Sequence, residues 1–143
     1  MKNLTPYLLS VLRLVAAFVY VAHGTQKLFG VPGHPFHAPV FAATLMGAAG
    51  VIETIAGSLI FVGLFTRPVA LVASGQMAVA YFTQHAPKGA WPIGNGGELA
   101  VLLCFIWLFF CVTGPGPISL DALRGRPDFS AWLADLQSAK PVK

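Results

Sequence analysis

The chain has 143 residues, of which 56% are hydrophobic and only 10% are charged, and its mean hydropathy is +0.72. Soluble domains carry roughly a quarter of charged residues, so this composition excludes an ordinary soluble domain and indicates a membrane protein with several spans. The net charge of +4 does not indicate nucleic-acid binding, because the sequence has no basic run with interleaved aromatic residues and most of its basic residues border apolar segments.

Four apolar segments, separated by turn signals, predict four antiparallel transmembrane helices. The first is expected from about Tyr7 to Leu28, and the second from about Phe41 to Phe65, after a loop rich in proline and glycine. The third is expected from about Val69 to His85. The fourth, from about Gly97 to Val112, is close to the shortest helix that crosses a bilayer. The predicted fold is therefore all-α: an integral membrane four-helix bundle formed by residues 1–117.

The remaining residues, 118–143, are predicted to form a polar C-terminal tail. Within it, apolar residues recur at spacings of three and four, as in a short amphipathic helix: Phe129, Trp132, Leu133 and Leu136. We expect this tail to lie along the cytoplasmic membrane surface.

The basic residues outside the spans predict the orientation. Only Lys27 and Lys88 fall on one side of the membrane, whereas the other side receives Lys2, Arg67, Arg124, Arg126, Lys140 and Lys143. Because cytoplasmic loops carry the excess of Lys and Arg, both termini are expected in the cytoplasm of a multi-pass inner-membrane protein.

The first span carries an unusual stripe of polar groups. At about 100° per residue on a helix, Tyr20 and Lys27 fall within roughly 40° of Arg13, and His23 lies about 80° round. A basic side chain at the bilayer centre costs about 2.5–3.5 kcal/mol, so this stripe should face the other helices. Glu53, the one charged residue of the second span, is the expected counter-charge, within reach of Arg13, Tyr20, His23 or Lys27.

Antiparallel packing at about 1.5 Å per residue places the polar groups at different depths. Arg13 and Gln76 are expected in the cytoplasmic half, and Glu53 near the middle of the membrane. His23, Lys27, His85, Asn95 and Glu98 gather towards the outer half. Imidazoles exchange protons near neutral pH, so His23 and His85, with Glu53, are the candidate catalytic residues. The candidate ligand-binding residues are Arg13, Tyr20, Lys27, Gln76, Tyr81, Asn95 and Glu98.

Several of these groups also have a structural explanation. Arg13 and Glu53 could form only a structural pair that fixes helix register, and Gln76 only a hydrogen bond between helices. Snorkelling at the interface would account for Lys27, and a favourable interaction with a helix N-terminus for Glu98. No metal site is predicted, because the pair formed by His34 and His37 has no third ligand nearby.

A set of short motifs in a fixed order is similar to a known family. The motifs are Arg13, His23-Gly24-x-x-Lys27-Leu28, Glu53-x-x-x-Gly57, Gly63-Leu64-x-Thr66-Arg67, Asn95-Gly96-Gly97-Glu98, and Gly114-Pro115-Gly116 with Ser119-Leu120-Asp121. Together, over about Leu12 to Asp121, they resemble the DoxX family of small bacterial and archaeal membrane proteins. The resemblance implies a four-helix bundle in the cytoplasmic membrane. Members are linked to a quinone-dependent oxidoreductase subunit in archaea and to membrane redox complexes in some bacteria, while most have no assigned activity.

Three functions remain open on the sequence. The first is a quinone-linked redox subunit, in which His23 or His85 with Glu53 would bind the ring between walls formed by Tyr20, Tyr81 and Phe82. The sequence has no Cys-x-x-Cys pair and no dinucleotide fingerprint, so any electron carrier would be a quinone or belong to a redox partner subunit. The second is a non-catalytic accessory or assembly subunit, and the third a small transporter or proton-conducting bundle. A homo-oligomer is compatible with each.

Overall fold

The computed structural model describes residues 4–33 and 44–125, and every element in these ranges is helical. The four longest are α1 (Thr5–Phe29), α2 (Leu45–Val62), α3 (Thr66–Ala80) and α5 (Glu98–Thr113). α3 continues into a π-helical turn, η1 (Tyr81–His85), and a 3-10 turn, η2 (Ala86–Lys88); the short helices are α4 (Pro92–Asn95) and α6 (Leu120–Leu123). The all-α prediction is therefore confirmed for these residues, and the helix ends lie within a few residues of the expected ones. The predicted amphipathic pattern between Phe129 and Leu136, and His34 with His37, lie outside the described residues.

Length and hydropathy single out two of these helices as membrane spans. α1, with 25 residues, and α2, with 18, are long and apolar enough to cross a bilayer. α3 has 15 residues and gains five from η1, and α5 is an apolar helix of 16 residues. Crossing of the membrane by all four helices therefore stays a prediction.

Local sequence explains where the helices begin and end. Pro6 opens the first turn of α1, where a missing N–H costs least, and Gly30 ends the helix at a φ of 69°. The Thr44 side chain caps α2 by accepting a hydrogen bond from the Gly47 N–H at 3.0 Å. Gly63, at a φ of 71°, ends α2 just before α3 begins. The short α2–α3 connection forces these two helices to be antiparallel neighbours.

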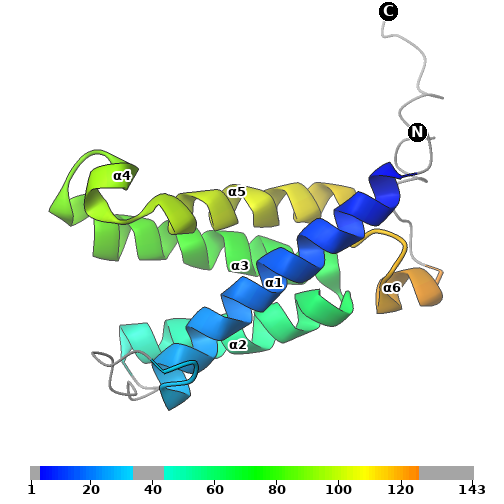
Figure 1. Ribbon diagram of the computed structural model, residues 1–143, viewed down its shortest axis with the longest axis horizontal. Coiled ribbons are helices and arrows are strands. Elements are labelled where there is room, and N and C mark those ends of the chain that lie inside the picture. Colours follow the sequence, from blue (N-terminus) through cyan, green and yellow to red (C-terminus); the bar gives the residue numbers. More distant parts are fainter. Residues whose placement is uncertain (1–3, 34–43, 126–143) are drawn as a thin grey trace, which may run out of the picture.

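The helices are arranged as two pairs. α1 packs along α2, α3 packs along α5, and contacts between α2 and α3 join the two pairs. Successive long helices run in opposite directions, as Figure 1 shows. At the end of the molecule that contains α6 the two pairs lie close together, whereas at the opposite end the α1–α2 pair diverges from the α3–α5 pair (Figure 1).

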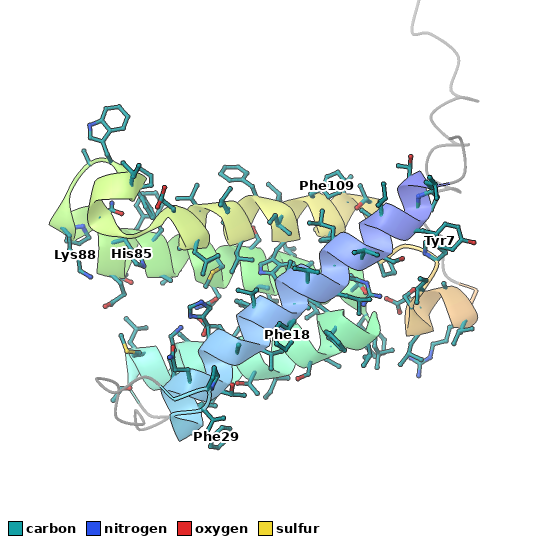
Figure 2. All side chains as sticks on the ribbon, viewed as in Figure 1. Tyr7, Phe18, Phe29, His85, Lys88 and Phe109 are labelled. Carbon is teal, nitrogen blue, oxygen red and sulfur yellow. The ribbon has the colours of Figure 1, made fainter. Side chains whose placement is uncertain are left out.

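The outside of the molecule is apolar. Phe18 on α1 and Phe109 on α5 lie on its surface (Figure 2), with 66% and 45% of their areas exposed. Small residues such as Ala17 and Ala73 are fully buried between the helices, together with the rings of Tyr20 and Trp107. Such an arrangement, with large apolar side chains outside and small ones at the helix contacts, suits lipid surroundings.

Candidate functional site

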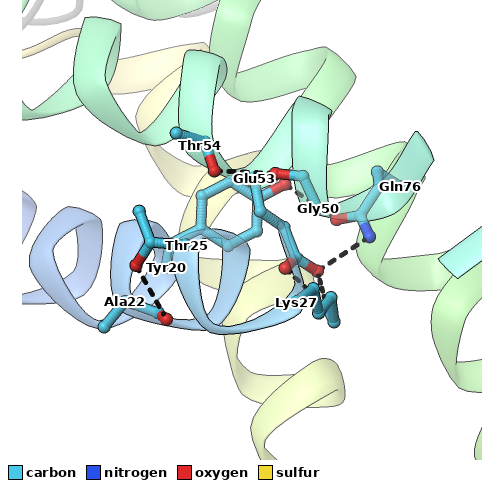
Figure 3. Close-up of polar contacts among 8 residues, drawn as sticks. All are labelled: Tyr20, Ala22, Thr25, Lys27, Gly50, Glu53, Thr54 and Gln76. Atoms are coloured by element: carbon cyan, nitrogen blue, oxygen red, sulfur yellow. Dashed lines mark hydrogen bonds and ion pairs between the residues drawn. The ribbon is translucent and has the colours of Figure 1, made fainter. Parts of the chain in front are cut away.

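A buried carboxylate connects three helices. Glu53 on α2 is 1% exposed and forms an ion pair with Lys27 on α1, whose Nζ lies 2.5 Å from both carboxylate oxygens. The Gln76 amide on α3 donates a hydrogen bond to Glu53 Oε1 at 3.1 Å, and the Tyr20 hydroxyl donates to Gln76 Oε1 at 2.7 Å. Figure 3 shows these four side chains converging from α1, α2 and α3. The prediction that Glu53 meets a basic or hydroxyl group of the first span is confirmed, and Lys27 is the partner.

Glycines on both helices bring Lys27 within reach of Glu53. A Cβ atom at Gly24 would lie 2.6 Å from the Thr54 backbone nitrogen, and one at Gly57 would lie 2.6 Å from a methyl group of Val21. Neither distance leaves room for a side chain, so α1 and α2 touch almost backbone to backbone there. The ion pair therefore depends on these close contacts as much as on its own charges.

Two cavities border this network. The first, which we call the central cavity, measures about 220 Å³, and its lining includes Tyr20, His23, Lys27, Glu53 and His85. The apolar part of its lining is Met77, Ala80, Leu99, Ala100 and Leu103, and Gly96 completes it. It lies among α1, α2, α3, η1 and α5, so the structure brings the three candidate catalytic residues to a single space.

The second, which we call the lateral cavity, measures about 330 Å³ and lies between the start of α2 and the end of α3. Its lining comprises Lys27, Leu45, Met46, Ala48, Ala49, Gln76, Val79, Ala80, Thr83, Gln84, His85 and Lys88. Lys27, Ala80 and His85 line both cavities. Sites for small molecules usually measure about 300–1,000 Å³; the lateral cavity, at about 330 Å³, falls in this range, and the central cavity, at about 220 Å³, is smaller.

The π-helical turn and the loop after it hold His85. His85 Nδ1 lies 3.2 Å from the Asn95 carbonyl oxygen, and the His85 ring stacks on Tyr81 with 6.4 Å between centroids. The Asn95 side chain in turn donates to the Gly89 carbonyl at 2.8 Å and accepts from the Gly97 N–H at 2.8 Å. The Asn95 side chain thus holds the loop by hydrogen bonds, and the Asn95 carbonyl together with the stacked Tyr81 ring fixes the orientation of the His85 ring. π-turns occur preferentially at functional sites, but the hydropathy pattern gave no sign of this one.

Arg13 lies far from this site, at the end of the molecule that contains α6. Its guanidinium is fully buried and donates to the carbonyls of Ile60, Phe61, Pro115 and Ile118, with 2.9 Å between Nε and the Pro115 oxygen. The pair between Arg13 and Glu53, one of the alternatives that the sequence left open, is not formed: Glu53 pairs with Lys27. The two residues lie at different levels, because Arg13 precedes Lys27, the partner of Glu53, by about 21 Å along the axis of α1. A ligand-binding role for Arg13 stays a prediction.

The segment after α5 completes this Arg13 contact. The Asp121 carboxylate caps the start of α3 by accepting from the backbone N–H groups of Phe65 and Thr66 at 3.0 and 2.8 Å. The Ile118 N–H donates to Ser10 Oγ at 3.2 Å. Sequence reasoning gave Asp121 no structural role. The signal that could have found it is the Ser119-Leu120-Asp121 motif, which follows the Gly114-Pro115-Gly116 stop after two residues. The first residues of the predicted tail thus contact the helices, and the division at residue 117 stays a prediction.

Gln76 and Glu98 are the two remaining candidates. Gln76, expected in the cytoplasmic half, reaches Glu53 and borders the lateral cavity. Glu98 is in the first turn of α5 and exposed, and it lines neither cavity. It suits the helix N-terminus, where a carboxylate is favoured.

Comparison with known proteins agrees with this picture of a membrane protein. The DoxX family profile matches residues 8–86, a range that contains Tyr20, His23, Lys27, Glu53, Gln76 and His85. An uncharacterized protein of Haemophilus influenzae is 39% identical over 125 residues, which cover 85% of this chain and 93% of that protein. The inner membrane protein YphA of Escherichia coli is 27% identical over 130 residues, which cover 81% of this chain and 89% of that protein. No solved structure matches the chain. The chain therefore belongs to the DoxX family and is a membrane protein of that type.

Proposed function

We propose that this protein is a quinone-linked subunit of the inner membrane that binds a small amphipathic molecule, such as a quinone, between its helices. One observation carries the proposal: His23, Glu53 and His85, which come from three different elements, all border the central cavity. Packing of the helices alone does not require two imidazoles and the Lys27–Glu53 ion pair to line the same cavity.

The topology that we propose has four spans, with both termini in the cytoplasm. The start of α1 and the segment after α5 lie at the same end of the molecule, since Ile118 hydrogen-bonds to Ser10. Arg124 belongs to that end, because its guanidinium lies over the ring of Phe65, and the Phe65 backbone N–H donates to Asp121 in the segment after α5. Arg67 belongs there too, because it lies two residues after Phe65. Lys27, His85 and Lys88 belong to the opposite end, which would face outward.

The lining of the central cavity suits a ring that carries oxygen atoms. Met77, Leu99 and Leu103 provide apolar walls for the ring, and the lateral cavity, with Leu45, Met46 and Val79, provides room for an alkyl tail. No hydrogen bond joins the His23 ring to another described residue, so its nitrogens are available to a ligand. The Lys27 ammonium has three N–H donors and uses two on the Glu53 carboxylate. His23 and Lys27 can therefore donate hydrogen bonds to a ring oxygen, while His23 and His85 can exchange protons with it.

Direct binding measurements test the proposal. Calorimetry with an alkylated benzoquinone, on protein in lipid nanodiscs, should give saturable binding to the parent protein and much weaker binding to the variant with both His23→Ala and His85→Ala. The Ser58→Ala variant is the matched control, because Ser58 is exposed and its hydroxyl donates only to Thr54 within α2. Equal binding by the double variant and the parent would refute the proposal.

A second function is favoured by a different observation. The polar side chains of the network supply one another's hydrogen-bond donors and acceptors: Tyr20, Lys27, Glu53 and Gln76. Polar groups that only fix the packing of helices form the same kind of closed network. On that basis the protein would be a non-catalytic accessory subunit of a membrane complex. It would then bind no quinone, and the Glu53 network would affect only stability.

A further inference from the structure

The contact between His85 and Asn95 determines which ring nitrogen of His85 carries hydrogen. The acceptor is the Asn95 backbone carbonyl, 3.2 Å from His85 Nδ1, and a carbonyl oxygen can only accept a hydrogen bond. Nδ1 must therefore be the donor. In a neutral imidazole only one nitrogen carries hydrogen, so Nε2 presents a lone pair.

The surroundings keep the ring in this orientation. Asn95 is 5% exposed, and its side chain is held by Gly89 and Gly97, so its carbonyl cannot turn away without disrupting the loop. Tyr81 stacks on the His85 ring at an interplanar angle of 19°. The two ring nitrogens point in nearly opposite directions, which places Nε2 on the edge of the ring away from the Asn95 carbonyl.

That edge has no partner in the part of the chain that the structure describes. No hydrogen bond joins His85 Nε2 to a described residue, and His85 lines both the central and the lateral cavity. A ligand oxygen without hydrogen, such as a quinone carbonyl, would set two acceptors against each other at Nε2. A hydroxyl group would instead donate a hydrogen bond to it.

We propose that the site recognises an aromatic hydroxyl group, as in a phenol or the reduced form of a quinone, through a hydrogen bond from that hydroxyl to His85 Nε2. This inference rests on the proposed binding of a quinone-type ring and narrows the ligand class. Lys27 also borders both cavities and offers a donor, so the two residues together favour a ligand with a hydroxyl at His85 and an acceptor oxygen at Lys27.

The test compares a 4-alkylphenol with its methyl ether, which has the same ring and tail but no hydroxyl hydrogen. Binding is measured in nanodiscs at about pH 8, at which a free imidazole is neutral. A net hydrogen bond to a neutral group should raise the ratio of phenol affinity to ether affinity by about three- to tenfold over that of a variant without the acceptor. The ratio of the two affinities is compared between variants, so that different partitioning into lipid cancels.

The decisive variant is His85→Asn. Its amide can still donate to the Asn95 carbonyl, which preserves the loop, but it has no ring nitrogen at the position of Nε2. The ratio of the phenol affinity to the ether affinity should therefore be about three- to tenfold lower in His85→Asn than in the parent protein. As a measurement without ligand, the ¹⁵N shifts of the His85 ring should report hydrogen on Nδ1 and none on Nε2.

The outcomes distinguish failure of the hydroxyl preference from failure of the proposed function. An unchanged ratio of phenol affinity to ether affinity in His85→Asn, or hydrogen on Nε2, would overturn the inference. If an alkylated benzoquinone still binds in that case, the proposed function stands and only the hydroxyl preference is wrong. If the benzoquinone, the phenol and the ether all fail to bind, both proposals are wrong.

Discussion

Replacing Glu53 by leucine removes the centre of the polar network while keeping a side chain of similar size. The change leaves the Lys27 ammonium and the Gln76 amide without the carboxylate that accepts their hydrogen bonds. We therefore expect Glu53→Leu to lower the free energy of unfolding.

The size of the loss follows from the burial of the two partners. Breaking a fully buried ion pair costs about 3–5 kcal/mol. Glu53 is 1% exposed but the Lys27 side chain is 26% exposed, so the ammonium can turn towards the nearby end of α1 and regain solvation. The penalty then has two parts, the ammonium that stays partly buried and the unpaired Gln76 donor, and we expect a total loss of about 1–3 kcal/mol.

Reversible unfolding in mixed detergent micelles, followed by tryptophan fluorescence, measures this loss. The double variant Glu53→Leu with Lys27→Met removes both charges and should recover the part of the loss that comes from the unpaired ammonium, because apolar replacement of a buried pair is often neutral, whereas the Gln76 amide stays without its acceptor. Ser58→Leu, on the exposed face of α2, is the control for introducing a leucine and should change stability by less than about 0.5 kcal/mol. The reasoning is refuted if Glu53→Leu is as stable as the parent, or if the double variant is no more stable than Glu53→Leu alone.

Three further predictions concern the packing and the topology. Arg13→Met leaves several buried carbonyls without a donor, and should cost about 3 kcal/mol or more in the same unfolding assay; a stable variant would contradict the structural role of Arg13. Gly24→Ala should cost about 1–3 kcal/mol because a Cβ there meets the α2 backbone, whereas Gly75→Ala, with no atom within 4 Å, should be neutral or slightly stabilising; similar effects of both would count against the close α1–α2 contact. With impermeant thiol reagents on intact cells, Gly89→Cys should be labelled from outside and Leu123→Cys only after permeabilisation, and labelling of both from one side would reject the proposed topology.

Much of the architecture could be predicted from the sequence because it depends on local chemistry. The apolar segments and the proline and glycine positions located each long helix to within a few residues, since hydropathy and helix capping act over a few neighbouring residues. The same pattern indicated that Glu53 would need a basic or hydroxyl partner on the first span, because an unpaired carboxylate between apolar helices is costly. Family membership was also readable, because the motifs that carry it keep their order along the chain.

The tertiary structure decided which partner each polar group received. Arg13 and Lys27 share one stripe of α1, and helical periodicity alone treats both as candidates for Glu53. The close contacts at Gly24 and Gly57 fix which level of α1 lies beside which level of α2, and this register places Lys27 at the carboxylate and leaves Arg13 to the carbonyls around Pro115. Likewise, the hydropathy pattern predicted that the third helix extends to His85, but it did not indicate how the His85 ring is oriented. The π-turn and the contact with the Asn95 carbonyl decide that orientation. Crossing angles and side-chain orientation depend on contacts between residues distant in sequence, and no local pattern encodes them.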